Sequence, residues 1–481
     1  MPTLHIVGLG PGSPALLTEQ AKLILGSASE VLLRTMHPAV EAIPPSVPVR
    51  TFDPLYETAD SFERVYEQIV EEVVARSQAR VGCVYAVPGD PSMGEATVAE
   101  LLRRAARGDL TVHVVHGISF LGPCLAALGI DGLDGLFVAD ALELARLHHP
   151  PFPPDRNALV GQLYSRLVAS DVKLTLMNAY PEGHPVALVD AAGTSEARVQ
   201  RMPLHAIDRS EAIGPLTALF VPALAPGHSL EAFQETVAHL RAPEGCPWDR
   251  EQTHATLRPH LLEEAYEALQ AIDTGDVPAL REELGDLLLQ IVLQAQIAVE
   301  DAEFSLGDVI HGIENKIRRR HPHVFGDLQL EEVDQVLRNW EALKASEREE
   351  AGLGRGLLEG VPAGLPALAQ AAEIQARVAR VGFDWPQADG ARRKILEELD
   401  EISQAGSERT AEEVGDLLFS VVNYARRLDV DAETALRTAI GRFRQRFARV
   451  EALAHQAGRE VSGMSLAEID ALWEKAKAEG L

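Results

Sequence analysis

The feature that most constrains the fold is an internal duplication in the C-terminal half of the chain. The segments LLEEAYEAL, REELGDLLLQIV, NKIRRRHPHVF and NWEALKA recur in the same order as ILEELDEIS, AEEVGDLLFSVV, GRFRQRFARVE and LWEKAKA. A repeat of this kind indicates that one structural unit occurs twice. In both copies Leu, Ala, Glu and Arg at helical spacing replace the signals of β-strands. From about residue 242 onward, the sequence therefore predicts two all-helical domains.

The N-terminal half has a different pattern. The β-branched runs LHIVGL, VGCVYAV, LTVHVVHG, VKLTLM and VALVDAAG alternate there with helical segments, which predicts an α/β fold of two subdomains. The predicted organisation is a multidomain chain with an α/β domain at residues 1–225 (subdomains at about 1–112 and 113–225), a linker at 226–241, a first helical domain at 242–350, a linker at 351–366 and a second helical domain at 367–481.

Composition narrows the environment and the partners. The 481 residues include 44 Lys and Arg against 72 Asp and Glu, a net charge of −28, so nucleic acid and anionic membranes are disfavoured as partners. No signal peptide and no run of about 18 apolar residues is present, so we expect neither export nor a membrane span. The three cysteines have no C-x-x-C spacing, which favours a reducing, cytoplasmic location and supports no structural zinc site.

Acidic side chains recur at the same spacing in both copies, as E-E-x-x-E on one predicted helix and E-x-x-D on the next. They are Glu263, Glu264, Glu267, Glu283 and Asp286 in the first copy, and Glu397, Glu398, Glu401, Glu413 and Asp416 in the second. A single E-E-x-x-E motif is typical of a solvated helix face. Because clustered carboxylates on paired helices repel one another, their repetition favours a bound cation. Carboxylate oxygens without a nearby Cys favour Mg²⁺, or Mn²⁺ in its place.

A basic cluster follows the acids in each copy. Its members are Lys316, Arg318, Arg319 and Arg320 in the first copy, and Arg442, Arg444 and Arg446 in the second. These residues either contact phosphate oxygens or pair with surface acids near a helix end. Carboxylates that hold a divalent metal, with guanidinium groups opposite, can bind a polyphosphate while a metal-polarised water attacks phosphorus. The pattern therefore indicates a polyphosphate hydrolase.

The helical half closely resembles the MazG family of nucleoside triphosphate pyrophosphohydrolases over about residues 240–481. The resemblance rests on LRAPEGCPWDREQTHATLRPHLLEEAYEAL, REELGDLLLQIVLQAQI and NKIRRRHPHVFGD, and in the second copy on VGFDW, ILEELDEI and AEEVGDLLFSVVNYARRL. It implies Mg²⁺-dependent hydrolysis of NTPs or dNTPs to the monophosphate and pyrophosphate. The implied metal ligands are Glu264, Glu267, Glu283 and Asp286 in the first copy, and Glu398, Glu401, Glu413 and Asp416 in the second.

The same resemblance implies further roles. Glu397 and Glu263 would orient the attacking water. The implied substrate-binding residues are Arg442, Arg446, Trp473 and Asn423 in the second copy, and Lys316, Arg320 and Trp340 in the first. A lysine is common in the family where Arg442 stands, and either tryptophan could instead belong to a helix core. Both acid sets are complete, so they do not decide which copy is active. Asn423, in place of Gln294 in the first copy, favours the second.

Three glycine-containing loops mark the N-terminal half: LHIVGLGPG, VYAVPGDPSMG and HGISFLGPCLAALG. Such glycines alone serve any tight strand-to-helix turn. In this order, however, the loops resemble the tetrapyrrole (corrin/porphyrin) methylase family, which binds S-adenosylmethionine between two α/β subdomains. The resemblance spans about residues 3–222, and His116 stands where that family commonly has proline. The implied cofactor-binding residues are Gly8, Gly10, Pro88, Gly89, Asp90, Pro91, Ile118 and Ser119.

Together the halves resemble fused methylase/MazG proteins, and three hypotheses stay open. The first is an NTP pyrophosphohydrolase fused to a methylase-like domain of unknown substrate. The second is a SAM-dependent methyltransferase whose helical repeats serve for dimerisation. The third treats the repeats as sensors that bind nucleotides without hydrolysis. In each case the broad apolar face after each E-x-x-D motif predicts at least a homodimer.

Overall fold

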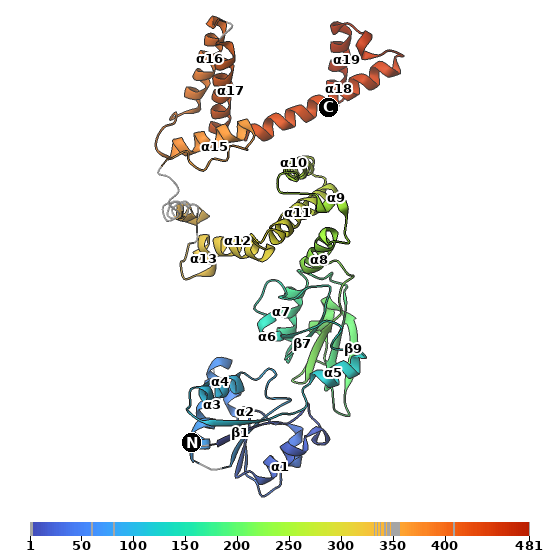
Figure 1. Cartoon of the computed structure of the whole chain (residues 1–481), viewed down its shortest axis with the longest axis vertical. Coiled ribbons are helices and arrows are strands. Elements are labelled where there is room, and N and C mark those ends of the chain that lie inside the picture. The colour runs from blue at the N-terminus through green and yellow to red at the C-terminus, as the bar shows by residue number, and fades with distance from the viewer. Residues whose placement is uncertain are drawn as a thin grey trace. The chain divides into compact units, whose positions relative to one another are not determined.

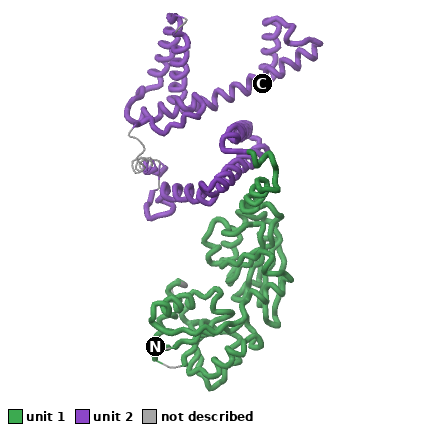
Figure 2. The backbone as a smooth tube through the Cα atoms, viewed as in Figure 1, with its two compact units in different colours: residues 1–251 green, residues 252–481 purple. Residues whose placement is uncertain are grey.

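The structure is a computed structural model. It describes residues 3–58, 61–79, 82–330, 332–333, 335–336, 338–340, 343, 347, 356–406 and 409–480. The chain forms two compact units, residues 1–251 and residues 252–481 (Figure 2). Among the helices of the described residues, none combines the length and the apolar character that a membrane crossing requires.

The first unit begins with a five-stranded sheet in the order β3-β2-β4-β1-β5. Its strands are β1 (Thr3–Gly8), β2 (Glu30–Leu33), β3 (Val49–Thr51), β4 (Cys83–Val87) and β5 (Thr111–Val115). Every pairing is parallel. Apolar clusters lie on both faces, one including Ile6 and Tyr85 and the other Val7 and Val84. Burial on two faces explains why these strands read as continuous apolar runs in the sequence.

Helices and short 3-10 turns connect and cover these strands. They are η1 (Pro14–Leu16), α1 (Glu19–Ser27), η2 (Pro38–Ala42), α2 (Asp53–Thr58), α3 (Phe62–Ala79) and α4 (Ala96–Ala106). Because the strands are parallel, the loops that leave the carboxyl ends of β1, β4 and β5 meet at one edge of the sheet. The predicted cofactor loops are these three.

A second five-stranded sheet follows, in the order β6-β7-β10-β8-β9. Its strands are β6 (Leu136–Asp140), β7 (Asn157–Gly161), β8 (Pro185–Asp190), β9 (Arg198–Pro203) and β10 (Thr217–Val221). The pair β6 and β7 is parallel, and the other pairs are antiparallel. The accompanying helices are α5 (Leu121–Leu128), α6 (Ala141–Leu144), α7 (Arg166–Leu176), η3 (Leu204–Arg209), α8 (Leu230–Arg241) and α9 (Pro247–Arg250). The predicted α/β fold of two subdomains is confirmed.

Three details of the prediction differ from the structure. The run VKLTLM lies at the end of α7, where Val172 and Leu176 are buried on one face of the helix, so its β-branched residues do not form a strand. The first sheet continues to Val115, three residues beyond the predicted subdomain boundary. Most of the predicted linker at 226–241 is helix α8, which Ser229 caps, and the first compact unit ends only at Glu251.

The described part of the second unit contains helices and no strand. Its helices are α10 (Arg258–Thr274), α11 (Val277–Glu300), α12 (Leu306–Arg320), α13 (Pro322–Phe325), α15 (Ala367–Arg380), α16 (Ala388–Gln404), α17 (Thr410–Arg427), α18 (Ala432–Gln456), η4 (Val461–Gly463) and α19 (Leu466–Ala478). Of the predicted second linker, residues 356–366 form turns and bends, and 351–355 lie outside the described residues. Helices α10 and α11 form one hairpin, and α16 and α17 form the other (Figure 1). The predicted pair of helical repeats is confirmed.

Candidate functional site

Each helical hairpin brings three carboxylates together. One oxygen of each carboxylate lies within 4.8 Å of an oxygen of the other two. The first triad is Glu264, Glu267 and Glu283, and the second triad is Glu398, Glu401 and Glu413. Two members lie three residues apart on the first helix and therefore share its face, and the second helix supplies the third. Asp286 and Asp416, which the sequence also predicts as ligands, lie outside the triads.

The second triad is the more buried of the two. Only 3% of Glu398 and 5% of Glu413 are exposed. In the first triad, Glu264 and Glu283 are half-buried and Glu267 is exposed. The Oε2 atom of Glu398 is buried and accepts no hydrogen bond from any described residue. A buried carboxylate oxygen without a partner is costly, and a divalent cation would satisfy it. The second triad therefore fits Mg²⁺ by its donor atoms and by this unpartnered oxygen.

Two cations hold the second triad, and the sequence analysis missed both. The Nζ atom of Lys394 lies 2.8 Å from Glu398 Oε1 and 2.8 Å from Glu397 Oε1. The Nη2 atom of Arg409 lies 2.7 Å from Glu413 Oε1. Each cation stands four residues before its buried partner, a spacing that places both on one helix face. This spacing was the signal in the sequence that could have revealed them.

At the matching positions of the first triad stand His260 and Ala279 in place of a lysine and an arginine, and the charge of His260 affects the pKa of Glu264 less than desolvation and the neighbouring acids do. Desolvation and then the charges of neighbouring acids raise the pKa of Glu264 and of Glu283. Glu263 is the predicted water-orienting residue of this copy. Its Oε2 atom lies 3.7 Å from Nδ1 of His260. The two repeats therefore have similar ligand geometry and different electrostatic surroundings.

The basic residues of the second copy lie on α18. The Arg446 guanidinium lies over the Trp473 ring at 5.8 Å, and the Phe443 ring is 5.0 Å from the same tryptophan. Trp473 is half-buried by these contacts. Arg442 is exposed and forms no ion pair with the described residues of the second triad. The structure thus groups Arg446 with Trp473, and it does not bring Arg442 to the carboxylates.

The basic residues of the first copy lie on α12. Arg320 is 2.5 Å and Arg319 is 2.7 Å from Glu347, and Arg320 also lies over the Trp340 ring at 6.0 Å. Lys316 is exposed. Of the two alternatives for this cluster, contact with phosphate or pairing with an acid, Arg319 and Arg320 therefore show the second in this structure.

The match between Asn423 and Gln294 needs a correction. Helices α11 and α17 are both continuous through this region, so the spacing from Asp286 and Asp416 is the same in both. By that spacing, the equivalent of Asn423 in the first repeat is the buried Leu293, and Gln294 is one residue further along the chain. The first repeat therefore has an apolar side chain where the second has an amide.

The three predicted cofactor loops meet as expected. A Cβ atom on Gly8 would lie 2.6 Å from both Gly117 N and Gly89 O, so only glycine permits this backbone approach. Asp90 Oδ2 accepts a hydrogen bond from Gly117 N at 3.1 Å and lies 3.0 Å from Nδ1 of His116. At Gly89, with φ +64°, the Cβ position faces open space. The loops therefore leave open space beside the half-buried Gly89, which a ligand could occupy.

The remaining predicted cofactor residues flank this junction. Gly10 forms an isolated β-bridge with Gly89. Pro88 and Pro91 lie beside Gly89 and Asp90 in the loop after β4. Ile118 is 37% exposed, and Ser119 Oγ accepts a hydrogen bond from Leu121 N at the start of α5. The set is contiguous in space around the carboxyl ends of β1, β4 and β5.

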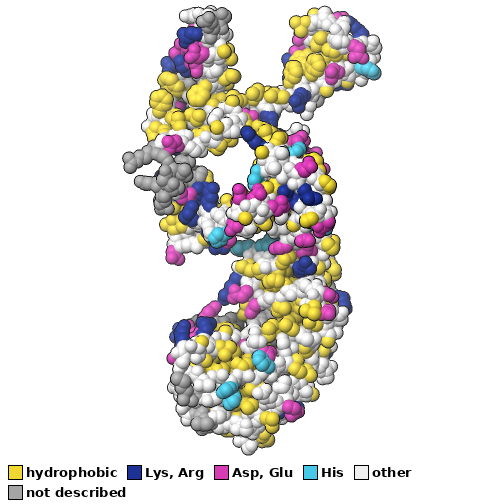
Figure 3. All heavy atoms as spheres, in the orientation of Figure 1, with side chains coloured by type: hydrophobic (Ala, Val, Ile, Leu, Met, Phe, Trp, Pro, Cys, Tyr) yellow, Lys and Arg dark blue, Asp and Glu magenta, His cyan; other side chains and the backbone are white. Residues whose placement is uncertain are grey.

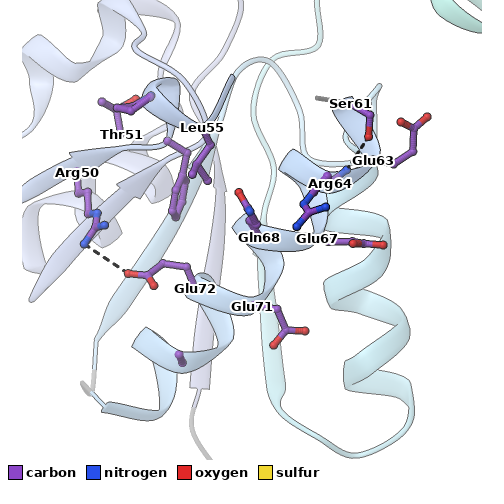
Figure 4. Close-up of a pocket in the computed structure, with 13 residues that line it drawn as sticks. Arg50, Thr51, Leu55, Ser61, Glu63, Arg64, Glu67, Gln68, Glu71 and Glu72 are labelled. Carbon is purple, nitrogen blue, oxygen red and sulfur yellow. Dashed lines mark hydrogen bonds and ion pairs between the residues drawn. The ribbon is translucent and has the colours of Figure 1, made fainter. Parts of the chain in front are cut away.

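A separate surface pocket of about 1070 Å³ lies on the first unit (Figure 4). Strand β3 and helices α2 and α3 line it, and Arg50 pairs there with Glu72 at 3.4 Å. None of the predicted cofactor residues is among those that line it. The pocket is therefore distinct from the cofactor loops.

The Lys394 contacts lead to one prediction about metal binding. We expect Lys394→Ala to destabilise the metal-free second repeat by about 1–3 kcal/mol, because Glu398 would stay buried with fewer partners. Mg²⁺ should reverse the loss and should bind several-fold more tightly, because the ammonium no longer competes for Glu398. Thermal unfolding with and without Mg²⁺ measures both effects. Lys22→Ala, which removes an exposed ion pair with Glu19 in the first unit, is the control and should change neither.

Comparison with known proteins agrees with this architecture. The family model described as Tetrapyrrole (Corrin/Porphyrin) Methylases matches residues 3–208, and the model described as MazG nucleotide pyrophosphohydrolase domain matches residues 252–325. A solved uroporphyrin-III-C-methyltransferase from Thermus thermophilus is 23% identical, over 46% of this chain and 94% of that one, with a TM-score of 0.37. A TM-score this low does not establish a common fold, so the assignment rests on the sequence matches.

One relative matches almost the whole chain, and two others match about half of it. A Bacillus subtilis protein described as "Uncharacterized protein YabN" is 39% identical over 490 aligned positions, 98% of each chain. The Thermotoga maritima "Nucleoside triphosphate pyrophosphohydrolase/pyrophosphatase MazG" is 44% identical, over 51% of this chain and 95% of its own length. An Escherichia coli K12 "Nucleoside triphosphate pyrophosphohydrolase" is 43% identical, over 50% of this chain and 94% of its own.

The fold and the matches define an enzyme with two parts, a tetrapyrrole methylase-like domain and a MazG nucleotide pyrophosphohydrolase region. The full-length match extends over both parts. The chain belongs to the family of fused tetrapyrrole methylase-like/MazG proteins.

Proposed function

We propose that this chain is a Mg²⁺-dependent nucleoside triphosphate pyrophosphohydrolase, with the second helical repeat as its active site. The observation that carries the proposal is the second triad, where buried Glu398 keeps one oxygen without a partner. The pyrophosphohydrolases among the relatives support the reaction class. Asn423 and the cations at 394 and 409 distinguish the second repeat from the first.

In this proposal water attacks the α-phosphorus of the nucleotide, the bond to the bridging oxygen of the β-phosphate breaks, and the products are the monophosphate and pyrophosphate. Glu398, Glu401 and Glu413 would hold Mg²⁺ or Mn²⁺, with Asp416 on the same helix as Glu413. A divalent ion held there would neutralise phosphate charge and make the attacking water more acidic. Glu397, at the solvent side, orients the water and accepts its proton.

The basic side chains bind the departing pyrophosphate. Lys394 and Arg409 already lie beside the triad, where their N–H groups would be within reach of the phosphates of a bound nucleotide. In this proposal Arg446 and Trp473, which lie together on α18 and α19, would contact the phosphates and the base, and Arg442 would reach the phosphates only if α18 moved toward the triad. In the first copy, Lys316, Arg320 and Trp340 are the corresponding candidates.

The deciding experiment is an assay of pyrophosphate release by the full chain with a panel of NTPs and dNTPs, with Mg²⁺ or Mn²⁺. We expect pyrophosphate and monophosphate in equal amounts and no turnover with EDTA. Release of orthophosphate instead would contradict the proposal. Tight nucleotide binding without turnover would favour the sensing alternative.

We also propose that the loops after β1, β4 and β5 bind S-adenosylmethionine. The close approach of Gly8, Gly89 and Gly117 and the open space at Gly89 support this, as does the family match. When bound, the cofactor supplies an electrophilic methyl group, and the backbone around Gly89 and Asp90 would hold it. Calorimetric titration of the full chain with S-adenosylmethionine tests the proposal, and absence of binding would remove the methyltransferase alternative as well.

The exposed apolar residues of α16 and α17 predict a homodimer. Leu418, Phe419 and Val421 are each more than 40% exposed, and hydrophobic side chains gather on the surface of this hairpin (Figure 3). Association would bury them. Light scattering coupled to size exclusion should give at least twice the chain mass of 52.1 kDa. A monomeric mass at micromolar concentration would refute the prediction, and Phe419→Glu should shift the dimer toward monomer.

A further inference from the structure

Asn423 lies on the face of α17 that carries Asp416 and about 80° around the helix axis from Glu413 of the second triad. It follows Asp416 by seven residues, which is about two helical turns and about 10 Å along the axis. That distance is comparable to the separation between the phosphates of a nucleotide and its base. Under the proposed function, on which this inference rests, Asn423 therefore stands where the nucleoside would lie.

Arg426 fixes the orientation of the Asn423 side chain. Its Nη2 atom donates a hydrogen bond to Asn423 Oδ1 at 2.7 Å. A guanidinium group can only donate, so it selects the carbonyl oxygen of the amide and not its nitrogen. The two N–H groups of Asn423 must then point away from Arg426. The amide is half-buried and presents donors, not an acceptor, to a ligand.

Asp384 in turn holds Arg426. The Arg426 Nη2 atom lies 2.7 Å from Asp384 Oδ1, and Arg427 Nη1 lies 3.4 Å from Oδ2 of the same carboxylate. The Trp385 backbone N–H adds a hydrogen bond of 2.8 Å. Burial would raise the pKa of Asp384, but these hydrogen bonds and charges outweigh it and lower the pKa. Asp384 is therefore charged at neutral pH and restrains the guanidinium.

The first repeat lacks all three groups. Leu293 and Gln296 stand at the positions of Asn423 and Arg426, and Arg250, as far before Glu264 as Asp384 is before Glu398, stands at the position of Asp384. Leu293 is buried, and Gln296 donates its hydrogen bond to Glu300 at 3.2 Å. The oriented amide thus belongs to the second repeat alone.

We propose that Asn423 reads the nucleobase through its amide N–H groups, and that Arg426 and Asp384 are positioning residues that keep those donors facing the substrate. A donor discriminates between bases that carry a carbonyl oxygen and bases that carry an amino group at the same place. The second repeat therefore favours keto nucleotides, with uracil, guanine or hypoxanthine, over amino nucleotides, with cytosine or adenine.

The test measures kcat/KM for pyrophosphate release by the full chain with UTP against CTP, and with ITP against ATP. We expect a preference of about tenfold or more for the keto member of each pair, as for a site that leaves a donor unpaired with the wrong base. Asn423→Ala should bring both ratios close to one. Asn423→Asp, which pairs with Arg426 and offers no donor, should reduce them to one or below.

The Arg426→Ala variant tests whether Arg426 positions the Asn423 amide or only stabilises the fold. It leaves the Asn423 amide free to rotate, so the keto/amino ratios should fall although the guanidinium touches no substrate. Mg²⁺ affinity, measured by calorimetry, should not change. Arg426→Lys keeps the charge if the alanine variant unfolds, and it should retain part of the preference. Gln296→Ala, the matched change in the first repeat, should leave both ratios as they are.

Wild-type ratios near one would overturn the inference, as would unchanged ratios in both Asn423→Ala and Arg426→Ala. In either case pyrophosphate release itself would continue, and the proposed function would stand. Failure of the proposed function has a different signature, because no nucleotide of the panel would then give pyrophosphate at all.

Discussion

Glu398→Gln should lower kcat for pyrophosphate release by about 10³-fold or more, which corresponds to about 4 kcal/mol of lost transition-state stabilisation. Glu398 is buried and its Oε2 atom has no partner among the described residues. The amide keeps the volume of the carboxylate but removes the charge that a divalent ion requires. It also leaves Lys394 without one of its two acidic partners. Both effects fall on the second triad and on no other part of the chain.

The matched control is Glu264→Gln, which makes the same change at the same position of the first triad. If the second repeat is the active one, this variant should keep the wild-type kcat within about threefold. Initial rates with UTP at saturating Mg²⁺ measure both variants, and circular dichroism checks that each is folded. Equal loss in both would assign activity to the two triads together. Loss confined to Glu264→Gln would refute the assignment to the second repeat.

The sequence was sufficient to predict the fold class because its patterns are periodic and local. The parallel strands of the first sheet are buried on both faces and read as apolar runs. In the helical repeats, the E-E-x-x-E and E-x-x-D motifs keep the same internal spacing in both copies. Prediction failed where local preference and tertiary packing disagree. Val172 and Thr175 favour a strand by propensity, yet both are buried on one face of α7, so packing determined the structure.

The candidate site was predictable in its acids and less so in their surroundings. Helical spacing alone places Glu398 and Glu401 on one face, and the hairpin adds Glu413. The four-residue spacing from Lys394 to Glu398 and from Arg409 to Glu413 is present in the sequence, but the burial of the two carboxylates, which makes these pairs important, depends on how the hairpin packs. The link from Asp384 to Arg426 joins positions 42 residues apart in sequence, a contact that exists only after the segment before α16 packs against α17.

Gly117→Ala should abolish binding of S-adenosylmethionine, with an affinity loss of at least about 100-fold. An added Cβ would lie 2.2 Å from Gly89 O and 2.8 Å from the Gly8 carbonyl carbon. Both contacts are with backbone, which cannot move aside as a flexible side chain would, so the loops after β1, β4 and β5 must separate. Overpacking of this kind costs about 1–3 kcal/mol or more. Gly183→Ala, where nothing lies within 4 Å of the added atom, is the control and should bind normally.

Calorimetry with S-adenosylmethionine measures the loss, and pyrophosphate release by the same variant should stay at the wild-type rate because the change lies in the other compact unit. If Gly117→Ala unfolds the first unit, Gly89→Ala still tests the site. Its Cβ would enter open space and meet no protein atom within 4 Å, although φ +64° adds strain of about 1–2 kcal/mol. A folded Gly89→Ala variant that binds the cofactor as well as wild type would show that the ligand does not lie against this loop, and the cofactor site would have to be sought elsewhere.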